Sequence, residues 1–267
     1  MDPRDVREEA QEEIEERLLM ASGYPPGEVP EVFEELSELF EAFAISHLLE
    51  RADQEAFRLN LVRAAQARRH FLGNSSADTD DLHFALSRSD GLFQALAAGN
   101  LALAVEISEL STDLWLPTRE YEEDFLYRSI LGSLTINTGF LAGGGGEMLG
   151  RFAEVLGGDT SPRLALAESF AKADPIGFRA ALVALIEERQ GAIDARRPDV
   201  VESDFLFWAS SYVFVESLAL LRIGELLGLS LEEDLPLCPR ESRLPISMVE
   251  DADLFEEVAK VRRGRGV

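Results

Sequence analysis

The chain offers few residues that could carry out nucleophilic or acid–base chemistry. It has three histidines, His47, His70 and His83, and one cysteine, Cys238. Nucleophilic catalysis needs a nucleophile, a base and a group that orients the base. Cys238 lies between Leu and Pro with no histidine nearby in the sequence, and His47 lies among apolar residues at helical spacing. We therefore expect a structural thiol, a packed imidazole and no enzymatic activity.

One group of residues has the side-chain types that ligate metals: His70, Asp78, Asp80, Asp81 and His83. Imidazole and carboxylate together can hold a divalent cation, but this spacing matches no established metal pattern. Aspartate also favours the start of a helix, as a cap and through the helix dipole. We predict no metal and no cofactor. An enzyme or metal protein that uses His70, Asp78, Asp80 and His83 is the alternative that metal analysis would test.

Charge is the strongest signal in the composition. Fifty Asp and Glu residues stand against 25 Lys and Arg residues, which gives a formal net charge of −25. Such an excess repels nucleic acid and anionic membranes and attracts basic protein surfaces. We therefore expect a basic protein as the partner, with no binding to nucleic acid or to a membrane.

Two acidic segments are the candidate contacts for that partner. The first comprises Asp78, Asp80 and Asp81. The second begins a predicted helix and combines carboxylates with a tyrosine, in the order Glu120, Tyr121, Glu122, Glu123 and Asp124. Acids in a first helical turn also complement the helix dipole, and that structural role is compatible with binding. An acidic patch that carries tyrosine suits arginine and lysine side chains of a partner.

Helical periodicity dominates the chain from Pro30 onward. No sustained alternation of apolar and polar residues indicates a strand, so we predict an all-α fold without a substantial β-sheet. A helix whose interior is Leu82–Leu86 is expected to begin at Asp78–Asp81. The other expected helices cover about 54–71, 121–137, 147–156, 178–189, 204–227 and 251–261.

Two stretches, Phe93–Ile107 and Phe170–Ala184, resemble one another. Each has a helix end, a turn of Gly, Asn or Asp, and then an alanine-rich helix. Small residues on facing helices permit close antiparallel packing, which is typical of αα-hairpins in tetratricopeptide-like arrays. No strict 34-residue period runs through the chain. The prediction is an irregular array of antiparallel helical hairpins.

The 267 residues fit one large domain preceded by a short segment. We assign residues 1–28 to an acidic N-terminal helical arm, which a Ser-Gly-Pro-rich turn ends, and residues 29–267 to a single helical domain with a short basic tail. A single cysteine allows no internal disulfide, and no signal sequence or membrane-spanning run is present. The longest apolar stretch, 205–221, is interrupted by polar residues and predicts a buried core helix. We expect a soluble cytoplasmic protein.

Three blocks together resemble the immunity protein 49 family of bacterial polymorphic toxin systems. They are the helical pair over 78–111, the Tyr121–Tyr127 block, and the Val215–Arg222 helix followed by Leu235–Pro239. The similarity covers roughly residues 45–245. It implies an all-helical cytoplasmic protein that binds and blocks a cognate toxin, and it carries over no catalytic or toxin-binding residues. The alternative is an acidic helical-repeat adaptor or scaffold, and the oligomeric state is left open.

Overall fold

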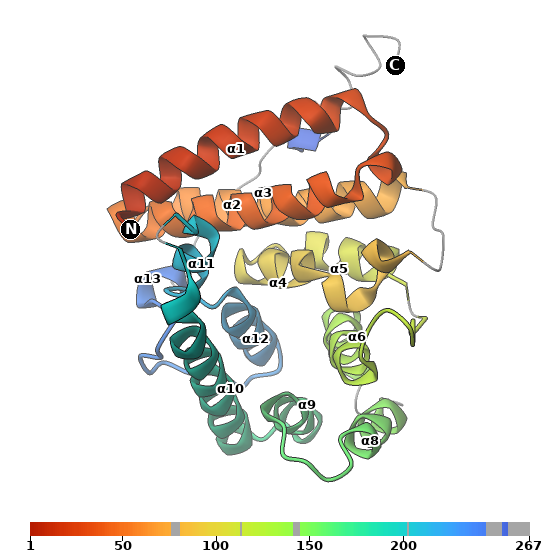
Figure 1. Ribbon diagram of the computed structural model, residues 1–267. Coiled ribbons are helices and arrows are strands. Elements are labelled where there is room, and N and C mark those ends of the chain that lie inside the picture. Colours follow the sequence, from red (N-terminus) through yellow and green to blue (C-terminus); the bar gives the residue numbers. More distant parts are fainter. Residues whose placement is uncertain (76–80, 113, 141–144, 202, 244–252, 256–267) are drawn as a thin grey trace.

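The fold is built from α-helices that stack in layers (Figure 1). The computed structural model describes residues 1–75, 81–112, 114–140, 145–201, 203–243 and 253–255. Within these ranges the only β-type pairing is one isolated bridge, between Leu235 and Cys238. The prediction of an all-α fold without a substantial β-sheet is confirmed.

Three long helices form one layer: α1 (Pro3–Gly23), α2 (Pro30–Arg51) and α3 (Gln54–Asn74). The turn between α2 and α3 is short, because Ala52 adopts a left-handed conformation that ends α2. The Asp53 side chain then caps α3 by accepting a hydrogen bond from the Ala56 N–H, at 3.0 Å. The two helices therefore pack antiparallel along their length.

Helix α1, the expected N-terminal arm, packs along α2. Its narrow apolar stripe is buried, with Val6, Ala10, Ile14 and Ala21 on the inner face. Ion pairs secure both ends, because Arg7 pairs with Glu50 at 3.1 Å and Arg17 pairs with Glu35. The arm is thus helical, and it is an integral layer of the stack.

Both predicted hairpins are present. Helices α4 (Asp90–Ala97) and α5 (Leu101–Leu110) meet at Gly99, whose φ of 78° favours glycine, and α9 (Pro162–Lys172) and α10 (Pro175–Arg196) meet at the left-handed Ala173. Asn100 and Asp174 cap the second helix of each hairpin. A wider helical-repeat arrangement remains a prediction.

The prediction of one helix that begins at Asp78–Asp81 is wrong for the described residues from 81 onward. The chain instead makes two 3₁₀ turns, η2 (Leu82–Phe84) and η3 (Leu86–Arg88), because Ala85 is extended and separates them. Phe84, Ala85 and Leu86 are nonetheless buried, as the apolar pattern indicates. Tertiary burial therefore decides this segment more than helical propensity does.

The prediction of a single helix over 204–227 is also wrong. The chain forms α11 (Phe205–Ser210) and α12 (Val215–Leu226), separated by a turn over 211–214. In the described part of the chain, Phe205–Leu226 is the one stretch long and apolar enough to cross a membrane by length and composition. The break between α11 and α12 and the burial of 61% of its apolar window fit an element of a protein core.

Helices α6 (Glu122–Ile136), α8 (Gly146–Val155), α9, α10 and α12 complete the stack below α4 and α5 (Figure 1). Helix α12 packs on α4, and Gly224 lets it approach α10 closely, since a Cβ there would lie 2.7 Å from Phe178 Cζ. The other elements are η1 (Pro26–Glu28), η4 (Arg197–Asp199) and α13 (Arg240–Arg243).

A buried polar network joins α6, α9 and α12. The Tyr127 hydroxyl donates to Glu216 Oε1 at 2.9 Å, and Arg163 Nε lies 3.5 Å from the same oxygen. Arg163 also lies 3.5 Å from Asp124 and covers the Tyr127 ring. Burial raises the pKa of Tyr127 well above its ordinary value, so its hydroxyl stays protonated as the donor.

We predict that Glu216→Ala lowers the free energy of unfolding by about 2–4 kcal/mol, because it leaves the Tyr127 hydroxyl and Arg163 without their buried acceptor. Urea unfolding monitored by circular dichroism measures the change. The matched control is Glu168→Ala on α9, which breaks an exposed pair with Lys172 and should cost about 0.5 kcal/mol or less. Equal losses in the two variants would contradict a structural role for the network.

Candidate functional site

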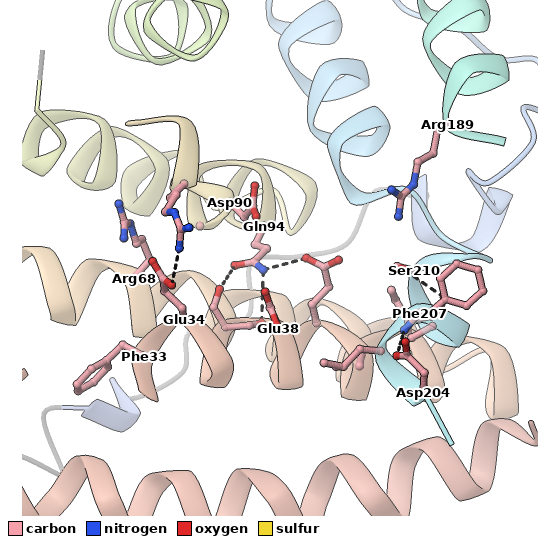
Figure 2. A pocket seen from close by; sticks show the side chains of 18 of the residues that line it. Phe33, Glu34, Glu38, Arg68, Asp90, Gln94, Arg189, Asp204, Phe207 and Ser210 are labelled. Atoms are coloured by element: carbon pink, nitrogen blue, oxygen red, sulfur yellow. Dashed lines mark hydrogen bonds and ion pairs between the residues drawn. The ribbon is translucent and has the colours of Figure 1, made fainter. Parts of the chain in front are cut away.

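Two grooves flank helix α11. The central groove, of about 740 Å³, lies between α2 and α4 on one side and α10 and α11 on the other (Figure 2). The α1–α11 groove, of about 620 Å³, lies between the start of α1 and α11. Asp204 and Phe207 line both, so the grooves adjoin each other. Both volumes are typical of ligand-binding clefts.

The helical periodicity of α2 positions the acidic wall of the central groove. Leu36, Phe40 and Ile45 turn into the core. An adjacent strip of polar residues at three- and four-residue steps then faces the groove, and it comprises Glu34, Ser37, Glu38 and Glu41. One helix therefore supplies both core packing and a charged wall.

A hydrogen-bond chain fixes Glu41 on that wall. The Ser37 hydroxyl donates to Gln94 Oε1 at 2.8 Å, and Gln94 Nε2 donates to Glu41 Oε2 at 2.8 Å. Gln94 is only 1% exposed and belongs to α4, so the chain also joins α2 to α4. The Glu41 carboxylate is half-buried and lines the groove.

Two carboxylates of this wall, Glu41 and Glu38, ionise less readily than usual. Loss of hydration raises the pKa of Glu41 to about 7, aided by the charges of Asp90 and Glu38 and opposed by the hydrogen bond from Gln94 and by Arg189. Loss of hydration also raises the pKa of Glu38, and Asp90, Glu34 and Glu35 raise it further. Glu41 is therefore poised between charged and neutral forms near neutral pH.

The opposite wall carries arginines from α10. Arg189 reaches into the space between α4 and α11 (Figure 2), and its guanidinium lies 5.6 Å from the Phe214 ring centroid. No ion pair joins Arg189 to a carboxylate in the described ranges, and its buried Nε has no hydrogen-bond acceptor there. Arg196, by contrast, pairs with Asp204 at 3.5 Å and covers Phe207.

The far end of the central groove is already neutralised. Glu34 contacts His83 Nδ1 at 3.0 Å and Arg88 at 3.1 Å. Arg68 donates to the His83 carbonyl at 2.7 Å, and burial lowers its pKa to about 10. These groups already form ion pairs or hydrogen bonds within the protein. Glu38, Glu41 and Arg189 line the groove without an ion pair among the described residues, and we call them the uncommitted charges.

The α1–α11 groove combines carboxylates with aromatic rings. Asp5 and Glu9 are exposed on α1, and neither has an ion pair with a described cation. Trp208 and Tyr212 line the other side, with ring centroids 4.8 Å apart. Carboxylates beside aromatic faces suit an ammonium or guanidinium group.

Of the three contact residues predicted in the first acidic segment, the structure describes Asp81, which has a structural role. Asp78 and Asp80 lie outside the described residues. Asp81 caps η2, where its side chain accepts from the His83 N–H at 3.0 Å. The described residues contain no group of three His, Cys, Asp or Glu side chains arranged to hold a metal ion.

The second acidic segment is divided between internal contacts and solvent. Glu120 accepts from the Ser87 and Leu116 amides, Glu122 pairs with Arg151 at 2.7 Å, and Asp124 pairs with Arg163. Tyr121 is 75% exposed and Glu123 is exposed. Of the five predicted contacts here, these last two are therefore the ones most open to a partner.

The surroundings of Cys238 and His47 are those of packed structural groups. Burial raises the pKa of the Cys238 thiol to about 11, and its sulfur lies 2.7 Å from the Ser217 hydroxyl. His47 packs edge-on against Phe43, and burial lowers its pKa. A thiol with so high a pKa is protonated near neutral pH and is a poor nucleophile.

The sequence analysis missed the groove residues Glu38, Glu41, Gln94 and Arg189. A weak signal exists, because Ser37, Glu38 and Glu41 are polar residues at helical spacing within a largely apolar stretch of α2. Their meeting with Gln94 and Arg189 depends on packing across more than fifty residues of chain, which no local pattern encodes.

Comparisons with protein-family models, with curated proteins and with solved structures found no match. The resemblance to the immunity protein 49 family therefore remains a prediction.

We predict that Glu41→Gln stabilises the protein at pH 8 and not at pH 5. A carboxyl whose folded pKa is raised favours folding least when ionised, so its cost grows as the pH rises from about 4.5 through about 7. The amide keeps the bond from Gln94 without the charge. The expected gain at pH 8 is about 1–3 kcal/mol, allowing for the hydration that a half-buried group retains.

Urea unfolding at the two pH values, with Glu109→Gln on the exposed face of α5 as control, measures the difference. A gain independent of pH, or one matched by the control, would contradict the raised pKa of Glu41.

Proposed function

We infer that this protein is a non-enzymatic immunity protein that binds and neutralises a cognate bacterial toxin, with its acidic surface covering a basic domain of the toxin. The single observation that carries the proposal is the set of unpaired carboxylates on the outer face of α1. Four of its exposed carboxylates, Asp5, Glu8, Glu9 and Glu12, have no cationic partner among the described residues.

The spacing of these carboxylates places them on the same side of α1. Residues 5, 8, 9 and 12 differ by three and four positions and lie on one face of the helix. The arginines of α1 are committed elsewhere, since Arg4 and Arg7 pair with Glu50 and Arg17 pairs with glutamates on α1 and α2. The negative surface is thus concentrated and faces solvent.

The α1–α11 groove gives that surface a place for an anchor residue. Asp5 and Glu9 belong both to the acidic face and to the groove, and Trp208 and Tyr212 offer aromatic faces beside them. An arginine or lysine of a basic partner would find charge and aromatic contact together, as binding hot spots commonly provide. The surrounding carboxylates would speed the encounter by electrostatic steering.

A toxin encoded beside this gene is the partner to test. Co-expression should rescue growth, and the two proteins should co-purify. Several unrelated partners and no effect on a toxin would instead support the adaptor or scaffold alternative.

We predict that the triple variant Glu8→Gln, Glu9→Gln, Glu12→Gln slows association with the toxin about tenfold at 50 mM salt and little at 500 mM, where screening shortens to a few Å. Stopped-flow or biolayer interferometry measures the rates. The matched control, Glu187→Gln, Glu188→Gln, Glu241→Gln, removes equal charge from exposed positions on α10 and α13. If both triples slow association equally, net charge and not the α1 face is responsible.

A further inference from the structure

The central groove holds opposite charges on facing walls without joining them. Glu38 and Glu41 on α2 and Arg189 on α10 all line it, yet no ion pair links them. Arg189 is close enough to lower the pKa of Glu41. Charges that attract each other and remain apart leave room for a molecule that carries both signs.

The acidic wall is preorganised, because hydrogen bonds within the protein already hold the Glu41 carboxylate in place. Gln94 and Ser37 are buried, and their hydrogen bonds hold one oxygen of Glu41, so the carboxylate loses little freedom on binding. On the basic side, the buried Nε–H group of Arg189 has no acceptor in the described ranges. Buried donors of this kind ordinarily have partners.

The remaining charged groups of the groove are satisfied within the protein. Asp90 pairs with Arg128 at 2.7 Å, and Glu34 and Asp204 pair with arginines as described above. The uncommitted set is two carboxylates and one guanidinium, which a ligand with two cationic groups and one carboxylate would complement. Leu206 and Phe207, both partly buried, add apolar surface that suits a methylene chain.

We propose that the central groove binds a free basic amino acid, with the ligand's carboxylate on Arg189 and its cationic groups on Glu38 and Glu41. This site is separate from the acidic face of α1 and does not depend on a toxin partner. The groove volume of about 740 Å³ is ample for such a ligand.

Binding should strengthen with pH. A cationic ligand favours ionised Glu41, whose pKa in the free protein is about 7, so binding releases a proton below that pH. The charges facing Glu41 are Glu34 and Glu38 on α2, Asp90 on α4, Arg88 on η3, Arg68 on α3, and Arg189, Arg196 and Asp204 on the opposite wall. From pH 6 to pH 8 the ionised fraction of Glu41 rises about tenfold, and affinity should follow it.

Isothermal titration calorimetry of the full chain with L-arginine and L-lysine tests the proposal. Glu41→Gln and Arg189→Gln should each weaken L-arginine binding about tenfold or more, as loss of a charge-assisted contact does. The matched controls Glu109→Gln and Arg119→Gln change exposed residues outside the groove and should bind as wild type does. Circular dichroism confirms that each variant is folded.

Agmatine, which lacks only the carboxylate of arginine, distinguishes the contribution of the acidic wall to binding from that of Arg189. It should bind more weakly than L-arginine, lose affinity in Glu41→Gln, and be indifferent to Arg189→Gln. The proposal is overturned if L-arginine gives no saturable heat up to about 10 mM at pH 8, or if both groove variants bind it unchanged. Binding of an end-blocked Gly-Arg-Gly peptide in place of free arginine would overturn it too, and would assign the groove to a protein segment.

Discussion

A shortage of cations shapes this molecule more than any other constraint. Most of the described α-helices carry acids, and the chain has one basic residue for every two acidic ones. A carboxylate near the core must be paired or hydrogen-bonded, because burying an isolated charge is costly. Several arginines pair with carboxylates that packing has partly buried, such as Glu50 and Glu216, while the acids on the outer face of α1 have no cationic partner among the described residues.

Arginine suits this shortage better than lysine does. Only Lys172 and Lys260 are lysines, and the other 23 basic residues are arginines. One planar guanidinium can serve several carboxylates at once. Arg17 contacts Glu13, Glu16 and Glu35, and Arg163 bridges Asp124 and Glu216 across three helices. Among the described residues, this distribution leaves an anionic stripe on α1 and Arg189 in the central groove without ion pairs.

The helices were predictable because their signals are local. Apolar spacing, Asp53, Asn100 and Asp174 as caps, and the turns of two hairpins all act within a few residues. The errors arose where distant packing prevails, as at Ala85, where the chain turns extended between two 3₁₀ turns, and over 211–214, where an apolar run breaks.

The candidate sites were less predictable, for a related reason. An acidic residue looks the same in the sequence whether it caps a turn, pairs with an arginine or faces solvent. Glu120 and Glu122 proved to be internally bonded, whereas Glu41 acquires its character only because α4 supplies Gln94 and α10 supplies Arg189. Charge composition thus indicates the kind of partner, and only the fold indicates where it would bind.

The central claim is that the fold holds a carboxylate in a groove without a cation near enough to neutralise it. The most direct measurement is a carbon-detected NMR titration of the glutamate side chains, with the Glu41 signal assigned by its loss in Glu41→Gln. The account predicts that Glu41 titrates near pH 7 and still higher when Arg189 is replaced by glutamine. A Glu41 signal that titrates near the ordinary glutamate value of about 4.3 would contradict it.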